Sequence, residues 1–146
     1  MSGNSRFAVS VHILAYLAYR QGVAVPSAEI ASSVDTNPVV IRRLLSALVR
    51  ARLVTTHKGA GGGFTLAAAP KQCTLLDIYR AAEPQPAQGQ GLQHFAPNHR
   101  CPVGARIEAI LQSAFAKAQA GMEAEFARIT LADIHEQLRP VCSGRH

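Results

Sequence analysis

The segment from Asn37 to Leu66 constrains the fold more than any other part of the sequence. Asn37 offers a capping side chain, and Pro38 occupies a first helical position, where its missing N–H costs nothing. Apolar residues then recur at i, i+3, i+4 and i+7. They are Ile41, Leu44, Leu45 and Leu48. This spacing predicts a helix to about Arg50 that buries one face. The opposite, outer face carries Val39, Arg42, Arg43 and Ser46.

Two short strands are predicted directly after this helix. Leu53–His57 is rich in Leu, Val and Thr, and Gly63–Leu66 has the pattern of a returning strand. The five residues between them, 58–62, read Lys-Gly-Ala-Gly-Gly, which is the composition of a turn. A capped helix followed by a hairpin with a glycine-rich tip predicts a wing beside that helix.

Two helices are predicted before this unit. Residues 5–20 are apolar nearly all round, which is typical of a central helix. After the break at Gly22, Ser27 is expected to cap a short second helix, with Glu29 in its first turn. Its inward-facing residues are Ile30, Ala31 and Val34. A turn at residues 35–38 then leads into the helix that begins near Pro38.

Three helices are predicted after the wing. Thr74–Asp77 resembles a capping box, with Asp in place of Glu, and begins a helix to about Ala82. Residues 83–100 are rich in Pro, Gly and Gln and are expected to form a loop. A long helix is expected from about Pro102 to Arg128, and a short one from Thr130 to near Pro140. We expect three segments in one compact unit: a DNA-binding region (1–82), a loop and possible sensor segment (83–100), and a dimerisation region (101–146).

Apolar residues form a stripe along the expected long helix. They are Ile107, Ile110, Leu111, Ala114, Phe115, Ala118 and Met122. At 1.5 Å per residue this helix is about 39 Å long, more than a small domain covers by itself. We therefore expect the stripe to form a homodimer interface, with an intramolecular core as the alternative.

The positive charge of the chain lies in its first half. Residues 1–71 contain eight Lys and Arg against two Asp and Glu, whereas residues 72–146 contain seven of each, and the net charge is +6. Five basic residues and no acidic residue fall between Arg42 and Lys58. A concentrated basic stripe is typical of proteins that bind polyanions, and a solvated basic face is the alternative.

Together these features predict a mainly α winged helix-turn-helix protein that binds double-stranded DNA. The N-terminal outer face of the second helix of such a pair enters the major groove. The predicted DNA-binding residues are Ser27, Asn37, Pro38, Val39, Arg42, Arg43, Ser46, Lys58, Gly61 and Gly62. Arg42 or Arg43 is expected to read guanine edges, with phosphate contact as the alternative, and Lys58 to contact phosphate.

Several segments of the chain also resemble one family of regulators. These segments are Asn4–Val9, Ser27–Ala31, Asn37–Leu45, Lys58–Leu66, Cys101–Gly104 and Ile129–Ile134. They are similar to the Rrf-type regulators, which include an iron–sulfur cluster regulator, a nitric-oxide-sensitive repressor and a cysteine-metabolism repressor. The resemblance covers about residues 4–138. It implies a dimer that binds DNA and forms where the long helix crosses its partner's copy. It also favours a repressor over an activator of transcription.

The cysteines depart from the pattern of the cluster-binding members of that family. Those members carry three cysteines in the loop before the long helix, whereas only Cys101 lies in this region here. We therefore expect no cofactor and take Cys101 as the candidate redox sensor, because a helix N-terminus and flanking cations lower a thiol pKa. Cys73 and Cys142 are expected to be bystanders. A metal or iron–sulfur site using Cys101 with His94, His99 or another cysteine is the alternative.

Other classes of protein are disfavoured. The chain contains no nucleophile elbow, P-loop, dinucleotide fingerprint or His-Glu-x-x-His motif, so we expect no enzyme. A helical interaction module that does not bind DNA would leave the basic stripe and the glycine-rich turn unexplained. Residues 7–19 carry no Lys, Arg, Asp or Glu but are too short to span a bilayer, so we expect no membrane contact. The three cysteines have no spacing typical of a disulfide framework, so we expect a protein of the reducing cytoplasm. The regulated genes, the operator and the signal, redox or small-molecule, remain open at this point.

Overall fold

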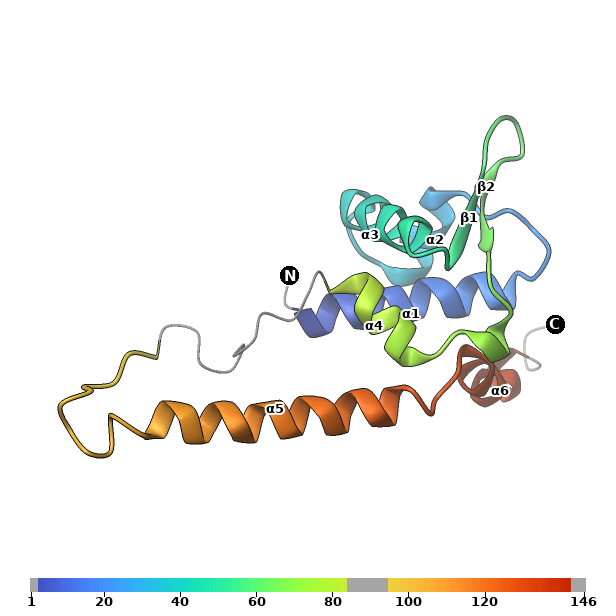
Figure 1. The fold of residues 1–146 in the computed structure, drawn as a ribbon. Helices are drawn as coiled ribbons and strands as arrows, with labels where there is room; N and C mark the ends of the chain where they lie inside the picture. Colours follow the sequence, from blue (N-terminus) through green and yellow to red (C-terminus); the bar gives the residue numbers. More distant parts are fainter. Residues whose placement is uncertain (1–2, 84–94, 143–146) are drawn as a thin grey trace.

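The computed structural model describes residues 3–83 and 95–142 of the 146-residue chain. The helices and strands are, in chain order, α1 (Gly3–Tyr19), α2 (Ser27–Val34), α3 (Pro38–Arg50), β1 (Val54–His57), β2 (Gly63–Leu66), the 3-10 turn η1 (Pro70–Gln72), α4 (Leu75–Ala82), α5 (Ile107–Phe126) and α6 (Leu131–Cys142). The predicted class, a mainly helical winged helix-turn-helix with a two-stranded wing and a long C-terminal helix, is confirmed (Figure 1).

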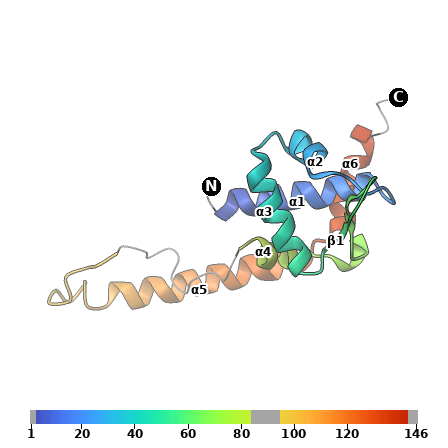
Figure 2. The same cartoon turned by 90° about the horizontal axis from the view of Figure 1, so that it is seen from above.

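Helix α1 is the centre of the fold, as its sequence predicts. It contacts α2, α3, α4, α6 and strand β2, and Figure 2 shows α3 crossing it. Ile13, Leu14 and Leu17 on α1 are buried in the one hydrophobic core of the described residues. Burying side chains on most sides of one helix lets the shorter helices pack around it without a large sheet.

Helices α2 and α3 form the predicted helix–turn–helix. Asn37 caps α3 as expected, because its side-chain oxygen accepts a hydrogen bond of 2.8 Å from the Val39 N–H. The four residues of the apolar stripe on α3 are all buried, and Asp35 ends α2 in the left-handed region at φ 57°. Asp tolerates this conformation better than most residues, and it turns the chain sharply between the two helices.

The expected cap at Ser27 is wrong. Ser27 is the first residue of α2, and Pro26 is the N-cap, with no side-chain capping bond. Pro26 has the extended backbone that an N-cap needs (φ −63°, ψ 149°), and its carbonyl accepts from the N–H groups of Glu29 and Ile30. Proline fixes φ near this value, so the cap falls one residue earlier than the preference for a capping side chain suggests.

The wing is a two-stranded antiparallel hairpin with Val54 opposite Leu66 and His57 opposite Gly63. It is also joined to the loop before α2. Val25 and Phe64 exchange two backbone hydrogen bonds, of 3.0 and 2.9 Å. These bonds attach the base of the wing to the helix–turn–helix, so the two elements are held in one orientation.

Two capping boxes link the winged helix to the C-terminal helices. Thr74 and Asp77 form the predicted box at α4, and Thr130 and Asp133 form a second one at α6. The two starts lie side by side as a β-bridge. The Leu75 N–H donates to the Ile129 carbonyl at 2.9 Å, and the Leu131 N–H donates to the Cys73 carbonyl at 2.7 Å.

Two predicted boundaries in the C-terminal region are wrong. The long helix begins at Ile107 instead of Pro102, because residues 101–106 form turns around Gly104. A Cβ on Gly104 would lie 2.0 Å from the Asn98 carbonyl oxygen, so this close packing holds the segment out of a regular helix. Helix α6 continues past Pro140 to Cys142, since a proline near a helix end removes only one backbone donor.

Part of the predicted loop, residues 84–94 with His94, lies outside the described residues. The proposed boundaries at residues 83 and 100 therefore stay a prediction. Among the helices that the structure describes, none is long and apolar enough to cross a lipid bilayer.

The core generates a first prediction. We expect Leu45→Ala to lower the free energy of unfolding by about 2–5 kcal/mol, because it leaves a cavity where α3 meets the rest of the core. Urea denaturation of the variant and the parent protein measures this difference. Val39→Ala is the matched control on the same helix, and because Val39 is exposed it should shift the free energy by no more than about 0.5 kcal/mol. Equal effects of the two substitutions would contradict the packing of α3.

Candidate DNA-binding surface

The outer face of α3 is the first part of the surface. Arg42 and Arg43 are exposed there, and Val39 at the N-terminal end of the helix is 44% exposed. The Ser46 hydroxyl donates a hydrogen bond of 3.0 Å to the Arg42 carbonyl oxygen, so its oxygen is left to act as an acceptor. The predicted outer residues of α3 therefore do share one exposed face, and it combines two guanidinium groups with an apolar side chain.

The N-terminus of α3 adds to the positive potential of this face. Asn37 and Pro38 are exposed at the start of the helix. Backbone N–H groups at a helix start carry partial positive charge and favour anions such as phosphate. The Asn37 cap occupies one of these donors, and Pro38 has none. Ser27 lies half-buried in the first turn of α2, at the corresponding end of the other helix of the pair.

The wing tip is the second part of the surface. Lys58 and Gly61 are exposed at the tip. A Cβ on Gly62 would lie 2.3 Å from the His57 carbonyl oxygen and 2.8 Å from that of Gly59, so only glycine fits this turn without a shift of the backbone. The His57 ring Nε2 lies 2.8 Å from the Thr65 hydroxyl across the strands. The tight turn at Gly62 and this contact between the strands give the part of the wing that carries Lys58 a defined shape.

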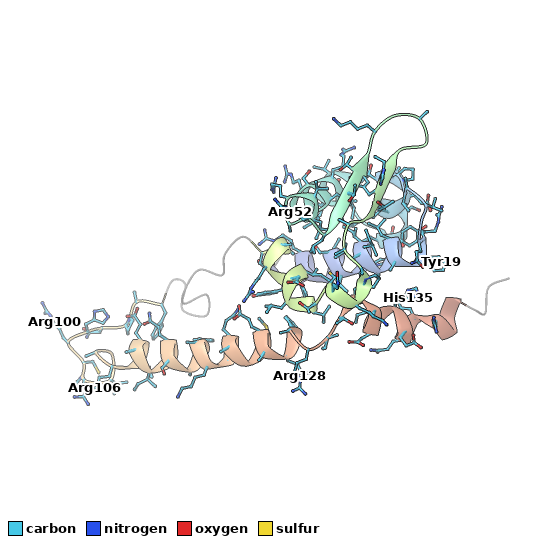
Figure 3. The ribbon with its side chains drawn as sticks, turned by 45° about the vertical axis from the view of Figure 1, so that its right-hand side comes forward. Tyr19, Arg52, Arg100, Arg106, Arg128 and His135 are labelled. Atoms are coloured by element: carbon cyan, nitrogen blue, oxygen red, sulfur yellow. The ribbon has the colours of Figure 1, made fainter. Side chains whose placement is uncertain are left out.

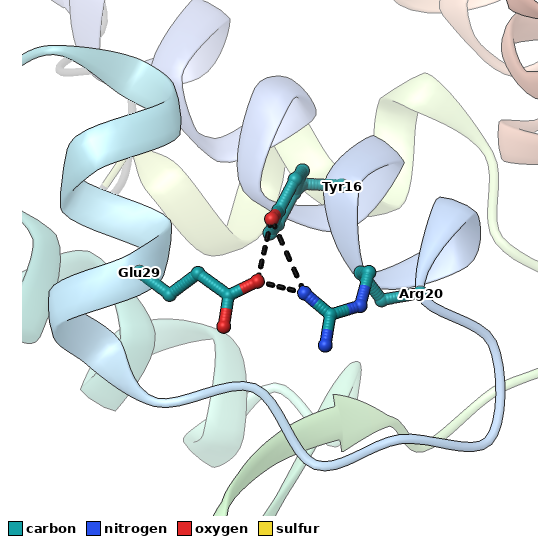
Figure 4. Close-up of polar contacts among 3 residues, drawn as sticks. All are labelled: Tyr16, Arg20 and Glu29. Atoms are coloured by element: carbon teal, nitrogen blue, oxygen red, sulfur yellow. Dashed lines mark hydrogen bonds and ion pairs between the residues drawn. The ribbon is translucent and has the colours of Figure 1, made fainter. Parts of the chain in front are cut away.

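A polar cluster that the sequence analysis missed connects α2 to α1 (Figure 4). The Tyr16 hydroxyl donates to the Glu29 Oε1 atom at 2.7 Å, and Arg20 pairs with the same oxygen. The Arg20 guanidinium also donates to the Tyr16 hydroxyl at 3.4 Å. Tyr16 lies in the last turn of α1 and Arg20 directly follows the helix, four residues later in the sequence. Their common partner, Glu29, depends on how α2 packs against α1. This cluster helps to fix the orientation of the helix–turn–helix.

The two halves of the surface lie on the same side of the molecule. In Figure 1, the α2–α3 pair and the wing lie above α1, and α5 lies below it. Figure 3 shows Arg52 with the α2–α3 pair, while Arg100 and Arg106 lie at the far end of α5. Arg52 is thus separated from the basic residues near the start of α5.

The structure places Cys101 away from this surface, in the turns before α5. The Cys101 side chain is exposed, and its carbonyl accepts from the Ala105 N–H at 2.9 Å, as at the start of a helical turn. Backbone N–H groups of Gly104 and Val103 bond to the sulfur and lower the pKa of the Cys101 thiol. Backbone donors thus replace the flanking cations as the cause, and His99 instead lies 3.6 Å from the Glu108 carboxylate.

Cys73 has the opposite environment. It is buried against the core beside the start of α4. Burial first, and the Asp77 carboxylate second, raise the pKa of its thiol to about 11. A thiol that stays protonated and buried is unreactive, which agrees with the bystander role predicted for Cys73. The side chain of Cys142 lies outside the described part of the chain.

Helix α5 is a third functional element, and it is unusual in its exposure. None of its 20 residues is buried in the single chain. Ile110 is 61% exposed and Phe115 is 42% exposed. Contact with the rest of the protein is at its C-terminal end, where Phe126 stacks on Phe7 with ring centroids 5.0 Å apart. The greater part of α5 therefore extends from the core with its apolar stripe uncovered (Figures 1 and 2).

Comparison with known proteins decides the class of this surface. Residues 3–137 match the Rrf2 family, which is described as an iron-dependent transcriptional regulator. The chain belongs to the Rrf2 family. This membership confirms the predicted class, a DNA-binding transcription regulator of Rrf type.

Individual relatives agree with the family over nearly the full chain. YwnA of Bacillus subtilis, named as an HTH-type transcriptional regulator, is 38% identical over 135 residues, which cover 92% of this chain and 98% of YwnA. The crystal structure of a protein from Lactobacillus plantarum, described as a transcriptional regulator, has 31% sequence identity and a TM-score of 0.79. The match covers 92% of this chain and 89% of that one. IscR of T. potens, at 24% identity and a TM-score of 0.68, shares the fold over 90% of this chain and 84% of its own.

The iron in the family description can be tested against the donors of this chain. Among the described residues, no group of three or more His, Cys, Asp and Glu side chains could hold a metal ion. Cys73 is buried beside α4, whereas Cys101 is exposed before the start of α5. The described donors therefore do not fit an iron site.

Proposed function

We propose that this Rrf2 family regulator works in the cytoplasm as a homodimer that binds an inverted-repeat operator and represses transcription. The observation that carries the proposal is the division of the molecule by α1, with the basic face of α3 and the wing on one side and the uncovered stripe of α5 on the other. One side is suited to a polyanion, and the other is suited to a second copy of the chain. Its relatives are named as transcription regulators, which are not enzymes.

The DNA-reading role is assigned to α3. Arg42 and Arg43 are exposed near its N-terminal end, where guanidinium groups can donate two hydrogen bonds to a guanine edge. Val39 adds an apolar contact, and Asn37, Pro38, Ser46 and Ser27 lie at the edges of the same contact. Lys58, Gly61 and Gly62 in the wing contact the adjacent backbone, where Lys58 pairs with phosphate. Phosphate contacts supply affinity for any DNA, and contacts to bases supply the preference for one DNA sequence over another.

The dimer role is assigned to α5. At 1.5 Å per residue its 20 residues span about 30 Å. The predicted stripe residues recur three or four apart, so they lie on one side of the helix. They are Ile107, Ile110, Leu111, Ala114, Phe115, Ala118 and Met122. Leaving such a stripe in water is unfavourable, and two copies related by a two-fold axis bury it against itself.

The sensing role is assigned to Cys101. Its exposure and its bonds from backbone N–H groups favour the thiolate, which is the reactive form. Peroxide would be attacked by the sulfur, giving a sulfenic acid with loss of hydroxide. The added oxygen changes size and hydrogen bonding in the turns that lead into α5. We propose that this change alters the dimer and weakens operator binding.

DNA binding should depend strongly on salt. About 6–10 phosphate contacts per dimer imply a fall in affinity of about 10³ or more between 50 and 200 mM salt. Fluorescence anisotropy with labelled duplex DNA measures the slope. Arg100→Ala, at the far end of α5 from α3 and the wing (Figure 3), is the control and should leave the slope unchanged. A flat response of the parent protein would contradict binding through this surface.

The arginines of α3 should differ from Lys58. We expect Arg42→Ala or Arg43→Ala to cost about 1–3 kcal/mol on the selected operator and less on random DNA, because a base contact is lost. Lys58→Ala should weaken both DNAs equally, since phosphates are present in every sequence. Competition titrations with the two DNAs measure the ratio. If the arginine variants lose affinity equally on both DNAs, neither arginine reads a base.

Dimer formation should depend on one side of α5. We expect the double variant Ile110→Asp, Phe115→Asp to sediment as a monomer at micromolar concentration, because burying two carboxylates without partners is costly. Ala116→Asp places the same group on the opposite side of the helix and should stay dimeric. Analytical ultracentrifugation separates the two species. A dimeric double variant, or a monomeric parent protein, would refute the assignment of α5.

The thiols should react differently. We expect iodoacetamide to modify Cys101 at neutral pH and to spare Cys73, whose pKa of about 11 keeps it protonated. Mass spectrometry of tryptic peptides identifies the modified residue. Peroxide should weaken operator binding of the parent protein and of Cys73→Ala, but not of Cys101→Ser. If Cys101→Ser responds to peroxide as the parent does, the signal acts elsewhere.

A further inference from the structure

A cavity at the base of the wing lies outside both surfaces described above. Its volume is about 510 Å³, within the range of small-molecule sites. It opens to solvent and is lined by the C-terminal end of α1 and the loop after it, by both strands of the hairpin, by Ala67–Ala69 and by His135 of α6. Figure 3 shows His135 on the side of α6 that faces the winged helix. We propose that this cavity binds an uncharged, mainly apolar small molecule that controls operator binding.

The lining determines the chemical class of the ligand. Three consecutive alanines, with Leu17 and Ala18 of α1, give the walls small apolar side chains. No Lys, Arg, Asp or Glu belongs to the described residues around the cavity. A carboxylate or ammonium group would find no opposite charge among these residues to offset the water that it gives up on binding, which is unfavourable. An uncharged ring or branched chain is therefore favoured over an ion.

His135 supplies one polar anchor for this ligand. Its ring Nδ1 is buried and has no hydrogen-bond partner among the described residues. A buried polar atom without a partner costs free energy, which a bound polar group can recover. The second torsion of a histidine side chain has broad minima, so a modest rotation of the ring turns this nitrogen toward the cavity. The other imidazole of the lining, His57, is already engaged with the Thr65 hydroxyl.

The position of the cavity connects it to DNA binding. His57 precedes Lys58 of the wing directly, and His135 belongs to α6, which follows α5 along the chain. A ligand in the cavity contacts both, so it stabilises one arrangement of wing and C-terminal helices over others. A ligand shifts such an equilibrium only by its difference in affinity for the two arrangements. This regulatory role rests on the proposed DNA-binding function, whereas binding in the cavity does not.

Indole is a suitable probe, because it is uncharged, mainly apolar and has one N–H donor for the imidazole. We expect indole to shift the amide signals of residues 66–69 and 135 in the full-length protein, and to change operator affinity at least threefold. Indole-3-carboxylate has the same ring with a negative charge and should bind at least tenfold more weakly. Shifts of these amides with the carboxylate that match or exceed those with indole would refute the uncharged class.

Three variants complete the test. Ala68→Leu fills the cavity and should abolish the amide shifts and the effect of indole on DNA binding, whereas Ala8→Leu, on the exposed part of α1, should retain both. His135→Phe removes the buried nitrogen, so indole should bind at least fivefold more weakly while the melting temperature is unchanged or higher. If Ala68→Leu fails to fold, His135→Phe alone tests whether indole binds in the cavity. Indole binding that survives both substitutions, or no shift in the parent protein, overturns the cavity assignment.

The same titrations separate this inference from the proposed function. A protein that binds operator without indole and ignores added indole retains the proposed function and loses the regulatory cavity. A protein that binds no operator loses the proposed function, while the amide shifts still report on the cavity.

Discussion

The burial of one face of α3 against α1, α2 and α4 determines what the opposite face can do. Because Ile41, Leu44, Leu45 and Leu48 fill the core, the helix cannot rotate without exposing them, and Arg42 and Arg43 must point to solvent. The cluster of Tyr16, Arg20 and Glu29 and the Val25–Phe64 bridge then fix α2 and the wing around the same helix. The proposed DNA-binding surface is thus a consequence of core packing, and it is rigid because the core is rigid.

The link between this body and α5 is narrow. It includes the paired capping boxes at Thr74 and Thr130 and the packing of Phe126 against the rings of Phe7 and Tyr79. The two proposed signals act at opposite ends of α5. Cys101 lies in the turns before its start, whereas the cavity is lined by His135 of α6, which follows its C-terminal end. In a dimer joined through α5, a small change in the angle between α5 and the winged helix would change the distance between the α3 helices of the two protomers. Half-site spacing on DNA is fixed, so such a change lowers affinity.

Local patterns made most of this fold predictable. The stripe of α3, the Asn37 cap and the glycine-rich turn each depend on residues close in sequence, and all three were predicted correctly. The errors arose at the boundaries of helices. Pro26, not Ser27, caps α2, and packing of Gly104 on the Asn98 carbonyl delays the start of α5. Two features were not predicted: the polar cluster that connects α1 to α2, and the cavity beside His135. Each is formed by segments that are separated in the sequence, so no local motif predicts it.

The central claim is that two copies of one basic surface read DNA together. Selection of bound duplexes from a random pool by the full-length protein, followed by sequencing, tests this most directly. The account predicts an inverted repeat with two identical half-sites about one helical turn apart, because a two-fold dimer presents two identical α3 helices. A single asymmetric half-site with full affinity, or no enrichment of any sequence, would contradict it.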